Sequence, residues 1–287
     1  MSYNVALRSN RFLRTISTLV VFWLTLVAPG AAQSDKVAVP LSDPSRPAVV
    51  KASLLNGSIS VAGYDGKDVV VQAKVRDEHE QPSRGGMKRV PMTATGLTAE
   101  EENNEVDIGA QSTQRAIDLT IQVPRRSSLR LHTVNDGDIL VTGVEGELDV
   151  DDVNGSVTLK NVSGNAVAHA LNGKVLVTFD RINPQKAMAF SSLNGDVDVT
   201  FPADVKANVI MTSDRGDVFS DFDIQLDQRA PAQSPVQGQR EGGRFKVVID
   251  KTVRGKINGG GQEIQFKNFN GNIYIRRAST ANASRPQ

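Results

Sequence analysis

The sequence predicts an all-β protein wound as a β-solenoid. Three features predict it: a glycine that recurs every nine residues, an alternating apolar pattern after each glycine, and an apolar residue two positions before it. The regular spacing is carried by Gly137, Gly146, Gly155, Gly164 and Gly173. Further copies with similar local sequence are centred on Gly57, Gly195, Gly216 and Gly271. Repetition of one short unit is typical of stacked, quasi-one-dimensional folds.

Each glycine is followed by small or branched apolar residues at its second and fourth positions, as in Ile139 and Val141 or Val157 and Leu159. A period of two residues indicates a β-strand with one buried face. Asn precedes the glycine in five copies, namely Asn56, Asn154, Asn172, Asn194 and Asn270. Because Asn and Gly adopt positive φ more readily than other residues, each copy predicts a tight corner followed by a short strand.

The residue two positions before the glycine distinguishes a wound coil from its alternative, an antiparallel meander or sandwich. In a meander of two-residue hairpins, Val153 would lie on the face opposite to Val157 and be exposed. This position is apolar in seven of the nine copies: Leu55, Val144, Val153, Val162, Leu171, Leu193 and Phe269, with Asn135 and Asp214 as exceptions. A solenoid explains the pattern if residues on both sides of the corner point inward.

The glycine spacings predict the size of a coil. Gly137, Gly155 and Gly173 are 18 residues apart, and spacings of 22 and then 21 residues lead on to Gly195 and Gly216. A coil of that length has two or three short sides, with successive coils stacked about 4.8 Å apart.

The N-terminus predicts export. Arg8, Arg11 and Arg14 precede an apolar stretch over 15–28, and the small residues Gly30 and Ala32 follow it. This order is typical of a secretory signal peptide over 1–32. The apolar run is shorter than the roughly 20 residues that a membrane span needs, so we expect no transmembrane span in the mature chain. An uncleaved anchor is the alternative. We expect the protein in the periplasm, at the cell surface or secreted, and without cysteine it has no disulfides.

The remaining chain divides into a linker over 33–48, a β-repeat domain over 49–276 and a disordered tail over 277–287. Within the domain we expect irregular inserts at 77–104 and 228–243, where Pro, Gly and charged residues interrupt the apolar pattern. Further strands are predicted at Val69–Val75, Ile117–Val123 and Phe245–Ile249.

Four units of the repeat carry a resemblance to a known family. They read LNGSISV from Leu55, VNGSVTL from Val153, LNGKVLV from Leu171 and LNGDVDV from Leu193. They resemble a bacterial family of exported β-strand-repeat proteins, described as adhesin-like and of unknown molecular function. The resemblance covers roughly residues 50 to 275. It implies an extended β-repeat body outside the cytoplasm and brings no catalytic or binding residues to this sequence.

The charged residues point away from nucleic acid and toward one candidate metal site. The chain has 33 basic and 32 acidic residues, which leaves no net field to attract phosphates. No Lys or Arg occurs between Arg130 and Lys160, where seven acidic residues gather. Four of them, Asp138, Glu147, Asp149 and Asp151, are candidate calcium ligands. Stacking would give Asp138 and Glu147 equivalent positions, and would pair Asp149 with Asp198. A solvated strand face is the alternative reading.

No catalytic constellation is evident in the sequence. His79, His132 and His169 show neither metal-site nor nucleophile-base spacing. We therefore predict a non-catalytic exported protein of the cell envelope, an adhesion, binding or scaffold module whose partner is a surface protein or glycan, with no cofactor unless calcium binds. The alternative is a carbohydrate-active enzyme, a polysaccharide lyase or hydrolase, because such enzymes also use β-solenoids.

Overall fold

The computed structural model describes residues 35–76, 95–110, 115–227, 239–241, 244–246 and 252–279, and within these ranges every regular element is a β-strand. None of them contains a helix that is long and apolar enough to cross a membrane. The predicted signal peptide over 1–32 lies outside the described residues. Strands β18 (Gln239–Glu241) and β19 (Arg244–Lys246) form a separate antiparallel hairpin.

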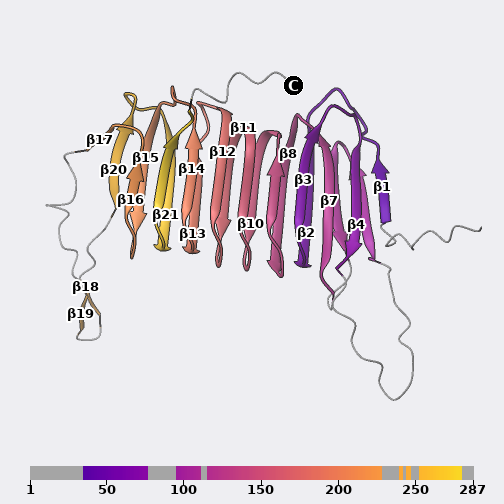
Figure 1. Cartoon of the computed structure of the whole chain (residues 1–287), viewed down its shortest axis with the longest axis horizontal. Helices are drawn as coiled ribbons and strands as arrows, with labels where there is room; N and C mark the ends of the chain where they lie inside the picture. The colour runs from indigo at the N-terminus through magenta and orange to yellow at the C-terminus, as the bar shows by residue number, and fades with distance from the viewer. Residues whose placement is uncertain are drawn as a thin grey trace, which may run out of the picture. The chain divides into compact units, whose positions relative to one another are not determined.

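The other 20 strands form one continuous sheet that is wound into two sides (Figure 1). In spatial order, side A consists of β5 (Leu97–Glu102), β6 (Glu105–Ala110), β2 (Ala48–Asn56), β8 (Ser127–Asn135), β10 (Glu145–Asp152), the second half of β11 (Val157–Ala170), β13 (Met188–Asn194), β21 (Gln262–Asn270), β15 (Ala207–Ser213), β20 (Val253–Ile257) and β17 (Ile224–Leu226). In the same direction, side B consists of β1 (Asp35–Val39), β4 (Val69–Val75), β7 (Ile117–Pro124), β3 (Ile59–Tyr64), β9 (Ile139–Thr142), the first half of β11, β12 (Val175–Ile182), β14 (Val197–Phe201), β22 (Ile273–Arg277) and β16 (Val218–Ser220).

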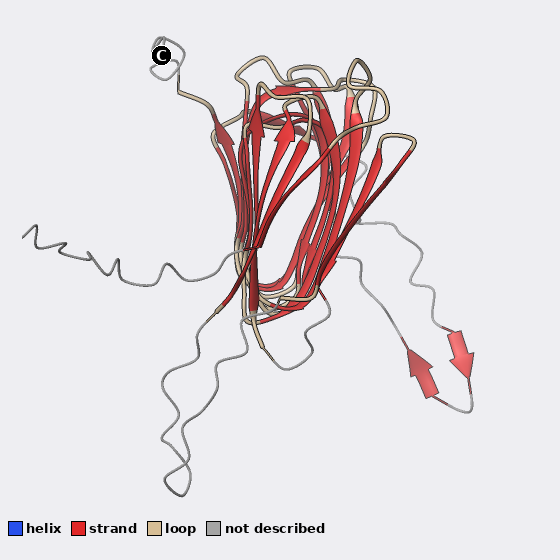
Figure 2. Cartoon of the chain, turned by 90° about the vertical axis from the view of Figure 1, so that its right-hand side faces the viewer, coloured by secondary structure: helices blue, strands red, loops and turns tan. Residues whose placement is uncertain are grey.

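The strand pairing confirms the solenoid and excludes the antiparallel meander. Every pairing between β8 and β14 is parallel, as expected for a chain that turns a corner and keeps winding. Viewed along the stacking direction, sides A and B face each other (Figure 2). The nine-residue glycine spacing is half a coil: Gly137, Gly155 and Gly173 turn the chain from side A to side B, whereas Gly146 and Gly164 lie at the start of side A strands. Antiparallel strands end the stack, with β4 beside β1 and β7, and β20 beside β15 and β17.

The coils do not stack in sequence order at either end. The coil of β2 and β3 lies between β6 and β7 on one side of it and β8 and β9 on the other. The coil of β21 and β22 lies between two other coils, that of β13 and β14 on one side and that of β15 and β16 on the other. In Figure 1, β2 and β3 accordingly lie to the left of β7 and β4, inside the row, and β21 lies between β14 and β16. The expectation that the Gly195 and Gly216 coils are neighbours is therefore wrong, because the Gly271 coil separates them.

Close backbone contact explains the glycines at the edge where side A turns into side B, which we call the Asn-Gly edge. A Cβ atom on Gly155 would lie 2.0 Å from the carbonyl oxygen of Gly137, and one on Gly173 would lie 2.0 Å from that of Gly155. The same contact, at 2.2 to 2.4 Å, continues through Gly195 and Gly271. Of these four glycines only Gly271 has a φ in the left-handed range, so the requirement at the others is space for the neighbouring coil.

The asparagines of the Asn-Gly edge have a different role from the predicted one. None of the five has a positive φ. Instead the side chains of four of them form a ladder with Asn135. Each amide Nδ2 donates to the Oδ1 of the neighbouring coil at 2.8 to 2.9 Å, from Asn154 to Asn135, Asn172 to Asn154, Asn194 to Asn172 and Asn270 to Asn194. Stacked amides of this kind are stabilising because every rung satisfies its neighbour. The ladder holds successive corners in register.

The residue two positions before the glycine is where the sequence argument fails. Val144 and Val162 are buried, but both precede corners at the opposite edge. At the Asn-Gly edge Leu55, Leu193 and Phe269 are exposed and Val153 is only half-buried. The inward position is one residue earlier. The solenoid is thus correct, although the pattern used to select it reflects an outward row of apolar side chains in five of the seven copies.

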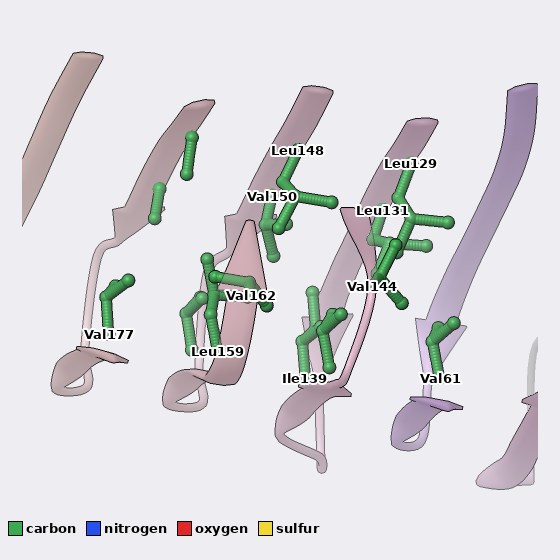
Figure 3. Close-up of a cluster of buried hydrophobic side chains, with 14 of the residues drawn as sticks. Val61, Leu129, Leu131, Ile139, Val144, Leu148, Val150, Leu159, Val162 and Val177 are labelled. Atoms are coloured by element: carbon green, nitrogen blue, oxygen red, sulfur yellow. The ribbon is translucent and has the colours of Figure 1, made fainter. Parts of the chain in front are cut away.

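The core fills the space between the two sides with inward-facing branched residues. Figure 3 shows one part of it, where Leu129, Leu131, Leu148 and Val150 of side A approach Ile139 and Leu159 of side B. Toward the other end the core becomes aromatic, with Phe179 stacked on Phe201 at 5.5 Å and Phe190 stacked on Phe266 at 5.6 Å between ring centroids. Each such side chain contributes roughly 1.5 to 3 kcal/mol by leaving water.

Several predicted boundaries are wrong. Asp35–Val39, placed in a linker, forms β1, and Leu97–Glu102, placed in an insert, forms β5, which pairs with β6. Gln239–Glu241, placed in the second insert, forms β18. The strand predicted at Phe245–Ile249 is observed only within Arg244–Lys246, and residues 247–249 lie outside the described residues, as do 77–94, 228–238 and 280–287. The predicted strands Val69–Val75 and Ile117–Val123 are confirmed as β4 and β7.

A glycine substitution tests the close approach of the coils. Gly173→Ala places a methyl group against the Gly155 carbonyl and should lower the free energy of unfolding by about 1–3 kcal/mol or more. Gly109→Ala is the matched control, because its Cβ would lie 3.2 Å from the Thr98 hydroxyl with no backbone in the way, and should cost about 1 kcal/mol or less. Denaturant titration measures both. Equal small effects would show that the coils are not in backbone contact at Gly173.

Candidate binding surfaces

The Asn-Gly edge carries an open concavity of about 620 Å³ near its N-terminal end. It is lined by Ser58, Arg76, Asn135, Asp136, Gly137, Asp138 and Asn154. Arg76 follows β4 and uses its whole guanidinium group within the protein, donating from Nε to Asp118 at 3.1 Å, from Nη2 to Asp118 and the Ser58 hydroxyl, and from Nη1 to the Asp136 carbonyl. Arg76 therefore ties β7 to the corners at Ser58 and Asp136.

The charges of this pair stabilise each other. Burial raises the pKa of Asp118, but hydrogen bonding to Arg76 and to the Ser58 backbone outweighs it and holds that pKa below its ordinary value. The hydrogen bond from Asp118 likewise raises the pKa of Arg76. Both groups stay ionised at neutral pH, so neither is suited to exchange a proton with a substrate.

The predicted calcium ligands do not converge. Asp138 lies at the Asn-Gly edge, where its Oδ1 accepts the backbone N–H of Ser156 in the next coil at 2.7 Å. Glu147 lies on the outer surface of side A, paired with Lys186. The expectation that Asp138 and Glu147 occupy equivalent positions is wrong because Gly137 and Gly146 belong to opposite edges. Asp149 and Asp198 are likewise on different sides. The described residues contain no group of three or more metal-ligating side chains placed to hold an ion, and calcium binding stays a prediction.

Asp149 and Asp151 face outward on side A, beside a second open concavity of about 420 Å³ that is lined by Lys51, Ala52, Ser53, Asp107, Arg130, Leu131, His132, Asp149 and Asp151. Asp107, Lys51, Arg130 and Asp149 share one row of the register here, so two neighbouring basic residues are flanked by an acidic residue on each side. Lys51 pairs with Glu105. The surface is a mixed, laterally paired array and not a focus of one charge.

Two histidines that are far apart in sequence come close together in this surface. His132, Asp151 and His169 occupy one row on three adjacent strands. His132 Nδ1 lies 3.4 Å from Asp151 Oδ2, and His169 Nδ1 lies 2.8 Å from the Ser191 hydroxyl. Sequence spacing did not predict this arrangement, because it depends on the stacking register. His79 lies outside the described residues.

An outward row of apolar side chains follows side A next to the Asn-Gly edge. We call it the apolar ridge, and it consists of Leu55, Val134, Val153, Leu171, Leu193 and Phe269, which lie within or just after the ends of six neighbouring strands. Leu55, Leu193 and Phe269 are exposed, and the other three are half-buried. It ends at Phe269, over whose ring the Arg215 guanidinium lies at 5.3 Å. Continuous exposed apolar rows are unusual on soluble surfaces and indicate contact with a partner. Its signal in the sequence was the apolar residue two positions before each glycine.

The outer surface of side B has an aromatic patch at its C-terminal end. Phe219 is 49% exposed and stacks on Tyr274 of the neighbouring strand at 5.3 Å and 13°. Arg276 lies over the Tyr274 ring at 5.1 Å and donates to Asp198 at 2.7 Å. Exposed aromatic side chains paired with arginine are enriched in binding interfaces.

Asp152 is the one ionisable side chain of the described core. It is fully buried in side A, and neither carboxylate oxygen has a hydrogen-bond partner among the described residues. Its counterparts in other coils are neutral: the Thr133 hydroxyl donates to the Gly57 carbonyl at 2.9 Å and the Ser192 hydroxyl to the Gly173 carbonyl at 2.8 Å. Burial, followed by repulsion from the Asp138 carboxylate, raises the pKa of Asp152 from its ordinary 3.8 to about 7.

Comparison with known proteins places this geometry in a family. A family model described as Toastrack DUF4097 matches residues 50–258. No curated protein is significantly similar in sequence. Among solved structures, a "putative cell adhesion protein" of Clostridium sporogenes is 11% identical over 86% of this chain and 99% of that chain, with a TM-score of 0.42. A "putative adhesin" of Bacteroides fragilis is 12% identical over 86% and 98% of the two chains, with a TM-score of 0.34.

The buried carboxyl makes stability depend on pH. Between about pH 4 and 7 the folded protein keeps a proton on Asp152 that the unfolded chain has lost, so the free energy of unfolding falls as pH rises through this window. The rise of the Asp152 pKa from 3.8 to about 7 lowers the free energy of unfolding by about 4 kcal/mol at pH 8. Asp152→Asn should therefore be more stable than wild type at pH 8 by up to about this amount, with the difference vanishing near pH 4. Denaturant unfolding at both pH values measures it, and a constant difference would show that Asp152 does not titrate in this range.

Proposed function

The chain belongs to the Toastrack DUF4097 family, and we propose that it is a non-catalytic binding and scaffold module of the cell envelope. The observation that carries the proposal is the state of its outer surfaces. Several of their charged groups are paired laterally between coils, as in Lys51 with Glu105 and Arg276 with Asp198. A catalytic site requires groups that converge on one point in a site that excludes water, whereas these rows run along two long faces.

Rigidity supports a binding role over an enzymatic one. The strands that carry the exposed residues are fixed by backbone pairing on both sides, so side chains project at a regular spacing of about 4.8 Å. A preordered surface of this kind loses little entropy when it binds an extended partner. The aromatic patch of Phe219 and Tyr274 is the part of side B best suited to such contact.

Export is the second element of the proposal and is supported by the basic, apolar and small-residue segments over 1–32. We expect protein recovered from the envelope or the medium to begin at Gln33, which N-terminal sequencing measures. A chain that keeps Met1 and stays in the cytoplasm would refute this part of the proposal.

Binding and catalysis are separated by one experiment with isolated cell envelopes. The purified protein should co-sediment with them saturably, and should release no reducing ends or unsaturated sugars from envelope polysaccharides. Phe219→Ser should weaken binding about tenfold or more, because an exposed aromatic anchor is worth about 2 kcal/mol. Leu226→Ser is the control, since Leu226 is an exposed apolar residue away from the patch. Protease-treated envelopes distinguish a protein partner from a glycan. Sugar release by the purified protein would establish an enzyme instead.

A further inference from the structure

We propose that the outer surface of side A pairs with the same surface of a second copy of this chain, about a two-fold axis that runs parallel to the strands between β11 and β13. The proposal is independent of the envelope binding described above. It rests on the distribution of apolar and charged side chains about that line.

The centre of the surface is mostly apolar. Val167 of β11 and Ala189 of β13 are cross-strand neighbours that both face outward, and Val167 is 42% exposed. The next outward row toward the Asn-Gly edge is polar, with His169 bonded to Ser191, and the row after it holds Leu171 and Leu193 of the apolar ridge. Two apolar pairs thus flank one polar pair along the proposed axis. A central apolar patch with a polar rim is the ordinary anatomy of a protein interface.

One pair of opposite charges lies at equal distances on the two sides of this centre. β10, one strand before β11, presents Glu147, Asp149 and Asp151. β21, one strand after β13, presents Glu263, Gln265 and Lys267 in the same rows. Asp149 and Lys267 form no ion pair within the described part of the chain. The register places Asp151 in the same row as Lys267, through His169 and Ser191.

A two-fold axis between β11 and β13 converts this pattern into complementarity. It sets β10 of one copy against β21 of the other, so Asp151 meets Lys267 of the second copy. The apolar ridge then meets itself, with Leu171 against Leu193 and Val153 against Phe269. An axis through β10 would instead set Asp149 against its own copy, which is repulsive. In the same arrangement Asp149 meets Gln265, and Glu147, which is already paired with Lys186, meets Glu263. The apolar ridge and the pair of Asp151 with Lys267 are therefore the contacts that favour a second copy.

The available area is sufficient. The six strands from β8 to β15, about 4.8 Å apart, and seven residues per strand, about 3.3 Å apart, span roughly 600 to 700 Å² of flat surface. Side chains increase the accessible area beyond this, and a stable interface of ordinary size buries about 800 Å² per partner. Two sheets that pack face to face do so at an angle of about 30°, which leaves the pairs near the axis in contact.

The test is the association state of the full chain, measured by sedimentation as a function of concentration. Wild type should be a dimer at micromolar concentration. Leu193→Glu should raise the dissociation constant at least tenfold without changing the melting temperature. Leu176→Glu is the matched control, because Leu176 is 39% exposed on side B and Leu193 is 38% exposed on side A. A wild-type chain that is monomeric at about 100 μM, or an equal effect of the two substitutions, would overturn the proposal.

A charge exchange tests the register of the pairing. Lys267→Glu alone should weaken the dimer at least tenfold, and adding Asp151→Lys should restore it, because the pair is then reversed but intact. Failure of the double variant to regain association, while it remains folded by circular dichroism, would show that these residues do not meet. The chain has no cysteine, so a mixture of Leu171→Cys chains and Leu193→Cys chains, whose altered positions face each other across the axis, should be joined by a short thiol-specific cross-linker. A mixture in which Leu176→Cys replaces Leu193→Cys should not be joined. Cross-linking through Leu176→Cys and not through Leu193→Cys would place side A of one copy against side B of the other and refute the proposal.

Discussion

The approach of one coil to the next at the Asn-Gly edge is the contact on which the rest of the structure depends. There the carbonyl oxygen of one corner glycine occupies the place where the next glycine would carry a side chain. A Cβ atom on Gly173 would lie only 2.0 Å from the Gly155 carbonyl oxygen. This contact sets the coil spacing, and the asparagine ladder fixes the lateral position of each corner. Because both are regular, the strands that leave these corners begin in register with their neighbours, as Val157, Val175 and Val197 do on side B.

How much of the fold the sequence predicts follows from which interactions are local. The glycine spacing and the alternation after each glycine are local, so the solenoid and most of its strands were predictable. The interleaving of β2 and β3 and of β21 and β22 was not, because it depends on which of several equivalent coils pair, and that choice is made by distant parts of the chain. The outward position of Val153 was misassigned because an apolar residue beside a corner can serve the core or a surface equally well.

The candidate surfaces were harder to predict than the fold for a related reason. Asp138, Glu147, Asp149 and Asp151 are neighbours in sequence, but alternation and the two edges distribute them over different surfaces. His132 and His169 are distant in sequence but share one row with Asp151. In a solenoid, functional proximity is decided by the coil period and not by sequence separation. The apolar ridge is the exception, since its members occupy the same place in each repeat.

The interleaved coils also determine how this body would respond to a load. An end coil of a simple solenoid has one hydrogen-bonded seam and can be peeled away strand by strand. Here the coil nearest the C-terminal end of the described chain, β21 with β22, is held by strands on both of its flanks, and the same is true of β2 with β3. Tension applied through the C-terminal segment must therefore shear two seams of parallel strands at once. The first described strand, β1, pairs with β4 alone, so tension from the N-terminal side loads an edge of the sheet first. The two ends of the described chain thus differ in how firmly they are held.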